Sequence, residues 1–147
     1  MKRHRTLIAL SRDHHVGLLL ATRLQQGKKA LLKLWSHDPQ WQAEYVVKFF
    51  DDELKEHFRL EETFLFPLAA SYLPDDRPMI QQLLTEHDEM RNMTDTLKDA
   101  GRKQPDLMLR RFGAVLEKHI RREERNFFPL CETNIPPEQL TSPGQFI

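Results

Sequence analysis

The sequence predicts an all-α fold, an antiparallel up-and-down four-helix bundle. Apolar residues recur three and four positions apart rather than in alternation, which is typical of amphipathic helices. Charged residues make up 30% of the chain and glycine contributes only 5 residues, a composition that disfavours a sheet. Short turns separate four such helical stretches, and short connections favour antiparallel neighbours.

A single domain is expected, since a chain of 147 residues buries about two thirds of the surface that it exposes when unfolded. We assign 1–134 to the bundle. The remaining 135–147 are expected to form an irregular C-terminal tail, because this segment is rich in proline and has no apolar period. The tail is either a loose extension or a segment laid over the bundle.

The first helix is expected at 11–26, with Ser11 as its N-cap and Gly27 as a weak point or end. Two adjacent histidines lie within it. The face that contains His14 carries more apolar residues than the face that contains His15. We therefore choose His14 as the inward residue and keep His15 as the alternative.

The second helix should begin at Asp38 and Pro39, which supply an N-cap and a first-turn proline. Its apolar stripe contains His57 and Glu61, and Pro67 should bend or end it.

A turn at 73–78 supplies a capping carboxylate for the third helix, for which Gly101 is a natural end. The fourth helix should run from Pro105 to Pro129. The inward stripes of these two helices contain His87, His119 and Glu123.

A twelve-residue stretch occurs twice. Residues 57–68 read HFRLEETFLFPL, and 119–130 read HIRREERNFFPL, so that His, Arg, both Glu, Phe, Pro and Leu recur at matched positions. A His and a Glu four positions apart stack on one face of a helix and reach a single point beside it. Each copy therefore presents a ligand pair that can hold a metal.

One inward histidine on an apolar stripe is usually a hydrogen-bonded core residue, but here four helices each carry one. Burying such groups unpaired would cost several kcal/mol for each charge, against a total stability of roughly 5–15 kcal/mol. A cation compensates by pairing the carboxylates and accepting the imidazole lone pairs. The candidate metal ligands are His14 (or His15), His57, Glu61, His87, His119 and Glu123.

Imidazole and carboxylate donors suit iron, manganese or zinc. The single cysteine, Cys131, excludes an internal disulfide and a cysteine zinc site, and we interpret it as a small core residue. Six ligands are too many for one tetrahedral zinc. They suit two metals about 3.5–4 Å apart, with each carboxylate able to bridge them.

These residues resemble the hemerythrin-like family of HHE cation-binding domains over about 11–129. The resemblance rests on Asp13-His14-His15, on Glu86-His87, and on the doubled His-x-x-x-Glu-Glu with its trailing Phe-Pro. It implies a non-haem centre of two iron ions, bridged by Glu61 and Glu123, that interacts with O2, NO or peroxide or senses iron. The preference for iron over manganese or zinc rests on this resemblance.

One position departs from the oxygen-carrying members of that family, which have a second histidine where this chain has Arg91. This makes a reversible oxygen carrier doubtful. Arg91 lies either near the site or on the solvated surface.

The leading hypothesis is a diiron-binding protein that binds or senses O2, NO or redox and iron status. The alternative is a diiron enzyme that acts on peroxide or NO, or donates iron. A metal-free helical adaptor ranks third.

Residues around the site are also predicted. A step of one residue turns Glu62 and Glu124 about 100° away from the ligands, which favours surface salt bridges for them over the alternative of supporting the metal ligands from behind. Glu53, one turn before His57, is expected to accept a hydrogen bond from that imidazole. Phe64, Leu65 and Phe127 are expected to wall the site.

Lysine plus arginine equals aspartate plus glutamate, both 22, which disfavours nucleic acid and anionic membranes as partners. No apolar run is long enough to cross a bilayer. We expect a cytoplasmic protein.

Overall fold

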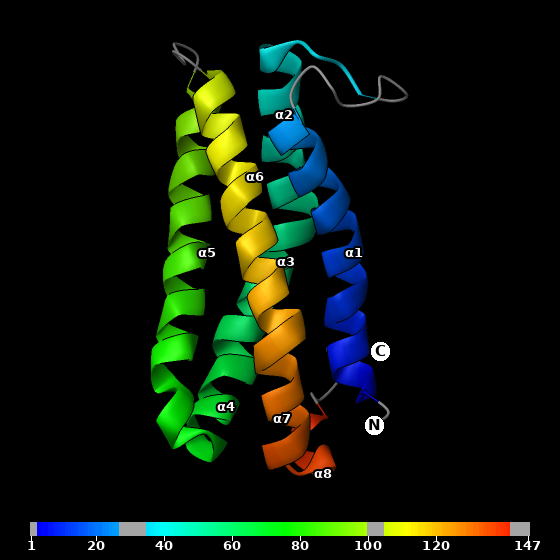
Figure 1. Cartoon of the computed structure of the whole chain (residues 1–147), viewed down its shortest axis with the longest axis vertical. Helices are drawn as coiled ribbons and strands as arrows, with labels where there is room; N and C mark the ends of the chain where they lie inside the picture. The colour runs from blue at the N-terminus through cyan, green and yellow to red at the C-terminus, as the bar shows by residue number, and fades with distance from the viewer. Residues whose placement is uncertain (1–2, 27–34, 100–104, 142–147) are drawn as a thin grey trace.

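The computed structural model describes residues 3–26, 35–99 and 105–141, so the predicted helix ends at Gly27 and Gly101 lie outside the described residues. Four long helical rods run alternately up and down (Figure 1), and the described ranges contain no strand. This confirms the predicted all-α, antiparallel up-and-down bundle. In chain order the rods are α1 (Arg5–Gln26); α2 (Pro39–Phe49), η2 (Phe50–Leu54), α3 (Lys55–Leu60), η3 (Glu61–Leu65) and α4 (Phe66–Tyr72); α5 (Arg77–Lys98); and α6 (Pro105–Arg122), η5 (Glu123–Phe127) and α7 (Phe128–Asn134).

Helix α1 begins at Arg5, so the prediction that it begins at Ser11 is wrong. The imidazole Nδ1 of His4 accepts a hydrogen bond from the backbone N–H of Thr6 at 3.1 Å, which satisfies a backbone donor of the first turn. Leu7 is fully buried, so the additional turn also packs into the core.

The second rod begins as predicted, because the Asp38 carboxylate accepts a hydrogen bond from the backbone N–H of Gln40 at 3.2 Å. The rod does not end at Pro67 but continues to Tyr72. A π-helical turn, η3 (Glu61–Leu65), comes directly before this proline. A proline ring crowds the preceding turn of a regular α-helix, and the wider π turn gives it room.

The fourth rod repeats this arrangement. The π-helical turn η5 (Glu123–Phe127) precedes Pro129, and the helix continues to Asn134, so the prediction of an end at Pro129 is wrong. α6 begins at Pro105, as predicted. The repeated Phe-Pro therefore marks a widened turn in each rod rather than a helix end.

Between the second and third rods lies a short 3-10 turn, η4 (Pro74–Asp76). Asp76 occupies the N-cap position of α5 but makes no side-chain hydrogen bond there, so the predicted capping carboxylate is not used.

The described part of the C-terminal tail contains the short helix α8 (Pro137–Leu140). Ile135 and Leu140 are 2% and 1% exposed and belong to the core. This part therefore lies over the bundle instead of being a loose extension. The division of the chain at residue 134 stays a prediction.

Two apolar clusters fill the interior. The lower cluster, at the end of the bundle where α1 begins (bottom of Figure 1), includes Leu7, Leu10, Leu83 and Phe127. The upper cluster includes Leu20, Leu24, Val46, Leu97 and Phe112. On the buried face of α1, His14 lies between Leu10 of the lower cluster and Leu20 of the upper cluster. The polar residue thus separates the two clusters. The candidate site is therefore a polar layer inside an apolar bundle.

Helices α1 and α6 approach each other closely at two glycines. A Cβ atom at Gly113 would lie 2.9 Å from the backbone oxygen of Ala21 and 3.0 Å from Leu24 Cβ. A Cβ atom at Gly17 would lie 2.8 Å from Ile120 Cδ1, the end of a flexible side chain. The first contact is with backbone and cannot yield without moving a helix.

We expect Gly113→Ala to lower the free energy of unfolding by about 1–3 kcal/mol, because overpacking between the helices outweighs the gain in helix propensity. Gly17→Ala should cost less, since Ile120 can adopt another rotamer. Urea unfolding followed by circular dichroism measures both. Equal costs would contradict the assignment of Gly113 as the tighter contact.

Candidate metal centre

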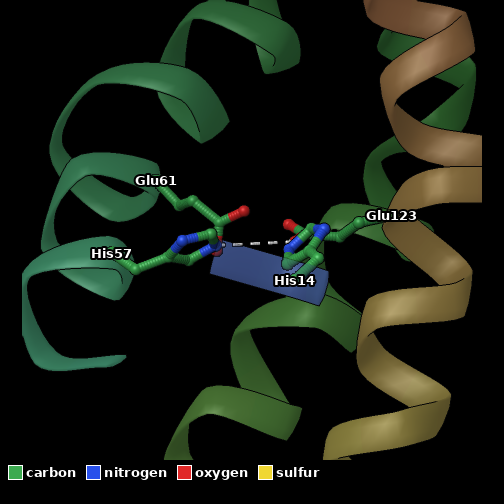
Figure 2. A group of neighbouring side chains, drawn as sticks. All are labelled: His14, His57, Glu61 and Glu123. Carbon is green, nitrogen blue, oxygen red and sulfur yellow. Dashed lines mark ion pairs between the residues drawn. The ribbon is translucent and has the colours of Figure 1, made fainter. Parts of the chain in front are cut away.

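The structure brings all six predicted ligand residues together in the polar layer. Each rod contributes one inward imidazole, and the second and fourth rods each add a carboxylate. Figure 2 shows His57 and Glu61 facing His14 and Glu123. His15 is exposed, so His14 is the inward residue of the adjacent pair. The exposed fractions are 4% for His14, 3% for His57, 1% for His119 and 0% for Glu61, His87 and Glu123.

The six residues form two overlapping groups, and the potential donor atoms within each group lie within 4.8 Å of one another. The first group is His14, His57, Glu61 and Glu123. The second group is Glu61, His87 and His119. Glu61 belongs to both.

The carboxylates of Glu61 and Glu123 lie between imidazoles of both groups. Distances from Glu61 Oε1 to the Nε2 atoms are 3.1 Å to His87, 3.5 Å to His57 and 3.9 Å to His119. Distances from Glu123 Oε1 are 2.9 Å to His14, 3.6 Å to His119 and 4.0 Å to His57. Either carboxylate can therefore bridge two cations.

Every inward imidazole directs its Nδ1 atom to a carboxylate outside the six. The pairs are His57 with Asp13 at 2.9 Å, His87 with Glu62 at 2.6 Å, His119 with Glu86 at 3.0 Å and His14 with Glu124 at 2.7 Å. We call Asp13, Glu62, Glu86 and Glu124 the outer carboxylates. An ionised carboxylate only accepts hydrogen bonds, so each Nδ1 carries a proton, and in the neutral form of each imidazole the Nε2 lone pair points inward.

The salt bridges predicted for Glu62 and Glu124 are present, but they are only part of what these residues do. Each does pair with an arginine, Glu62 with Arg91 and Glu124 with Arg3. Their main contact, however, is an imidazole of the site. The step of about 100° turns each side chain toward the neighbouring rod rather than into solvent.

The prediction for Glu53 is wrong, because this residue is exposed and Asp13 bonds His57 instead. Asp13 and Glu86 were missed as partners of the imidazoles. A signal was present in the sequence, since an acidic residue stands directly beside His14, Glu61, His87 and Glu123.

Aromatic rings cover the imidazole faces. Phe58 stacks on His87 with ring centroids 3.7 Å apart, and Phe128 stacks on His14 at 5.4 Å. Both phenylalanines are fully buried. Neither was predicted to wall the site; of the residues that were, Leu65 and Phe127 are buried in the lower cluster.

Several inner atoms have no hydrogen-bond partner among the described residues. They are His14 Nε2, His57 Nε2, Glu61 Oε2 and both carboxylate oxygens of Glu123. His87 Nε2 and His119 Nε2 lie 3.2 Å apart, although both carry lone pairs when Nδ1 holds the proton. Orphaned buried acceptors are costly, and this set fits a cation.

The charges point the same way. Within the described part of the chain, the carboxylates of Glu61 and Glu123 and the four outer carboxylates are accompanied by three guanidinium groups that pair with them, those of Arg3, Arg91 and Arg122. With neutral imidazoles the cluster thus lacks positive charge, which either bound cations or protons can supply.

The pKa directions show how protons fill this role in the metal-free chain. Burial opposes the charged form of His57, but Glu61 and the surrounding carboxylates outweigh burial and hold its pKa well above the usual value. Burial likewise opposes the charged form of His119, whose pKa is raised to about 9 by Glu123, Glu61 and Glu86. Ligand protons and metal ions compete for the same nitrogen atoms.

The chain is an antiparallel helical bundle with a buried layer of histidines and carboxylates that could hold metal ions. The chain matches the hemerythrin HHE cation binding domain over residues 4–131 and belongs to that family. No curated protein and no solved structure gives a significant match. None of the described helices has both the length and the hydropathy that a membrane crossing requires. The cytoplasmic location and the exclusion of nucleic acid stay predictions.

The geometry ranks the carboxylates by their effect on metal binding. Glu61→Gln and Glu123→Gln should abolish tight binding, because each removes an anionic oxygen from the centre. Glu62→Gln and Glu124→Gln should weaken it by roughly 10–100-fold, since they only orient an imidazole. Competition against a chelator measures these affinities.

His15→Gln is the matched control for this series, because His15 lies beside a predicted ligand but is exposed. It should bind metal like the unsubstituted chain. If the inner and outer glutamate variants lost affinity equally, the assignment of inner and outer positions would be wrong.

Proposed function

We propose that this chain holds two iron ions and binds or senses a small ligand such as O2 or NO, or reports redox or iron status. The ligands would be His14, His57, Glu61, His87, His119 and Glu123. The observation that carries the proposal is the sharing of carboxylates: Glu61 and Glu123 each approach imidazoles of both ligand groups. A single cation would leave one group uncompensated.

The donor chemistry supports iron. Histidine and carboxylate ligands with remaining open positions are the pattern of non-haem iron sites that react with oxygen. Each ion would take two imidazoles and share two carboxylates. When bound, iron supplies open coordination positions and a change of oxidation state. Manganese and zinc are the alternatives that the same donors accept.

The chain's own residues orient the imidazoles and exclude water. The outer carboxylates fix the rings, and Phe58 and Phe128 cover two of them. Arg91 Nη2 lies 2.8 Å from Glu62 Oε2, so its side chain is engaged outside the centre. All four outer carboxylates are likewise engaged with an imidazole. These contacts favour binding or sensing over turnover of an organic substrate.

We expect anaerobic reloading with Fe²⁺ to give about two iron ions per chain, because two ligand groups share carboxylates. Iron content is measured after gel filtration, and near-ultraviolet and visible spectra are recorded under argon, air and NO. Glu61→Gln is the control and should retain little iron.

The outcomes separate the competing hypotheses. Two irons with spectra that respond to O2 or NO support the proposal. Sustained consumption of peroxide would favour the enzyme instead. No bound iron, together with unfolding that a chelator does not alter, would leave the metal-free adaptor.

A further inference from the structure

We propose that Arg3 and Arg91 are a matched pair of positioning residues. Each holds in place one imidazole that would bind one of the two ions. Arg91 would hold His87, and Arg3 would hold His14. This inference rests on the proposed two-ion function. It assigns a role to two arginines that are not ligands.

Arg91 contacts both groups that restrain His87. Its Nη2 atom lies 2.8 Å from Glu62 Oε2, the same oxygen that accepts the hydrogen bond from His87 Nδ1 at 2.6 Å. Its Cζ atom also lies over the ring of Phe58, 5.7 Å from the centroid. Phe58 in turn stacks on His87 with an interplanar angle of 12°. The Arg91 guanidinium thus contacts Glu62, which bonds the edge of the His87 ring, and Phe58, which stacks on the face of that ring.

Arg3 makes the corresponding two contacts beside the other group, except that it pairs with Oε2 of Glu124 while His14 Nδ1 bonds Oε1, and it also pairs with Glu132 at 3.3 Å. It forms an ion pair with Glu124, which accepts a hydrogen bond from His14 Nδ1 at 2.7 Å. Its Cζ atom lies 5.7 Å from the ring centroid of Phe128, which stacks on His14, also with an interplanar angle of 12°. The arrangement therefore occurs once in each ligand group.

The repetition argues against an accidental surface ion pair. The side chains of Arg3 and Arg91 are only 29% and 36% exposed, and both glutamates are 25% exposed. Arginine suits such a position because its planar guanidinium can pair with a carboxylate and stack on a ring at once, which lysine cannot do. Arg122 differs, since it pairs with the outer carboxylate of Glu86 at 3.4 Å but lies over no aromatic ring of the described residues.

The test measures affinity for Co²⁺, whose visible absorption reports its ligands, by competition with a chelator. Arg91→Leu and Arg3→Leu should each weaken binding of one ion by roughly tenfold, the lower end of the range for residues that orient a metal ligand. The visible absorption bands of the Co²⁺ ion whose binding is weakened should also change. Arg91→Lys should restore only part of the affinity, because the charge returns without the planar face.

Arg59→Leu is the matched control. Arg59 lines the same surface hollow of about 390 Å³ as Arg91 and Glu62, but it pairs with Glu56 at the surface. This variant should bind Co²⁺ like the unsubstituted chain.

Double variants test whether each arginine acts through its own glutamate. Arg91→Leu should add little to Glu62→Gln but should be additive with Glu124→Gln, and the reverse should hold for Arg3→Leu. A purely structural role would lower the thermal stability of the metal-free chain without this selectivity. Full additivity in all four combinations, or no loss of affinity in either single variant, would overturn the inference.

The two proposals fail separately. An unsubstituted chain that binds two Co²⁺ ions, with unchanged binding in both arginine variants, overturns only the role of the arginines. An unsubstituted chain that binds only one ion overturns the two-ion function. The roles of the arginines are then decided by whether the arginine variants bind that ion more weakly. A chain that binds none overturns both. If Arg91→Leu does not fold, Arg91→Lys and the Arg3 series decide the matter.

Discussion

The polar layer depends on a closed ring of hydrogen bonds that runs once around the bundle. Asp13 of α1 bonds His57 of the second rod, Glu62 of the second rod bonds His87 of α5, Glu86 of α5 bonds His119 of the fourth rod, and Glu124 of the fourth rod bonds His14 of α1. Each rod thus takes part in two bonds, one through its acid and one through its histidine. No rod can rotate or slide without breaking both of its bonds, so the ring fixes the register of the helices. Packing of similar apolar side chains alone would specify this register only weakly.

The alternating direction of the rods explains where the acids stand in the sequence. On α1 and α5 the acid precedes the inward residue, as in Asp13-His14 and Glu86-His87. On the second and fourth rods it follows, as in Glu61-Glu62. A step backward along a helix that runs up and a step forward along one that runs down both turn the side chain in the same sense around the bundle axis. The ring therefore closes only in an antiparallel bundle.

The fold and the inner residues could be predicted because they depend on periodicity within one helix. His57, Glu61, His119 and Glu123 follow from the doubled repeat, whereas the choice between His14 and His15 needed the packing of α1. The roles of Asp13 and Glu86 could not be read from a single helix, because an outer carboxylate serves the imidazole of a different rod. The choice between a bend and an end at Pro67 could not be made for another reason: the π turn that accommodates the proline has no sequence signal as plain as the proline itself.

The ring also creates the need for a cation. Because every Nδ1 proton is committed to an outer carboxylate, all four Nε2 lone pairs face the two buried glutamates, and acceptors meet acceptors in the interior. The bonds that fix the helix register thus leave the inner nitrogen and oxygen atoms without hydrogen-bond donors as long as the imidazoles are neutral. Protons can fill the deficit, as the raised pKa of His119 shows, but they charge imidazoles that are buried. Cations compensate the same oxygens and also accept the same lone pairs, so metal binding and stability of the bundle are coupled through the ring.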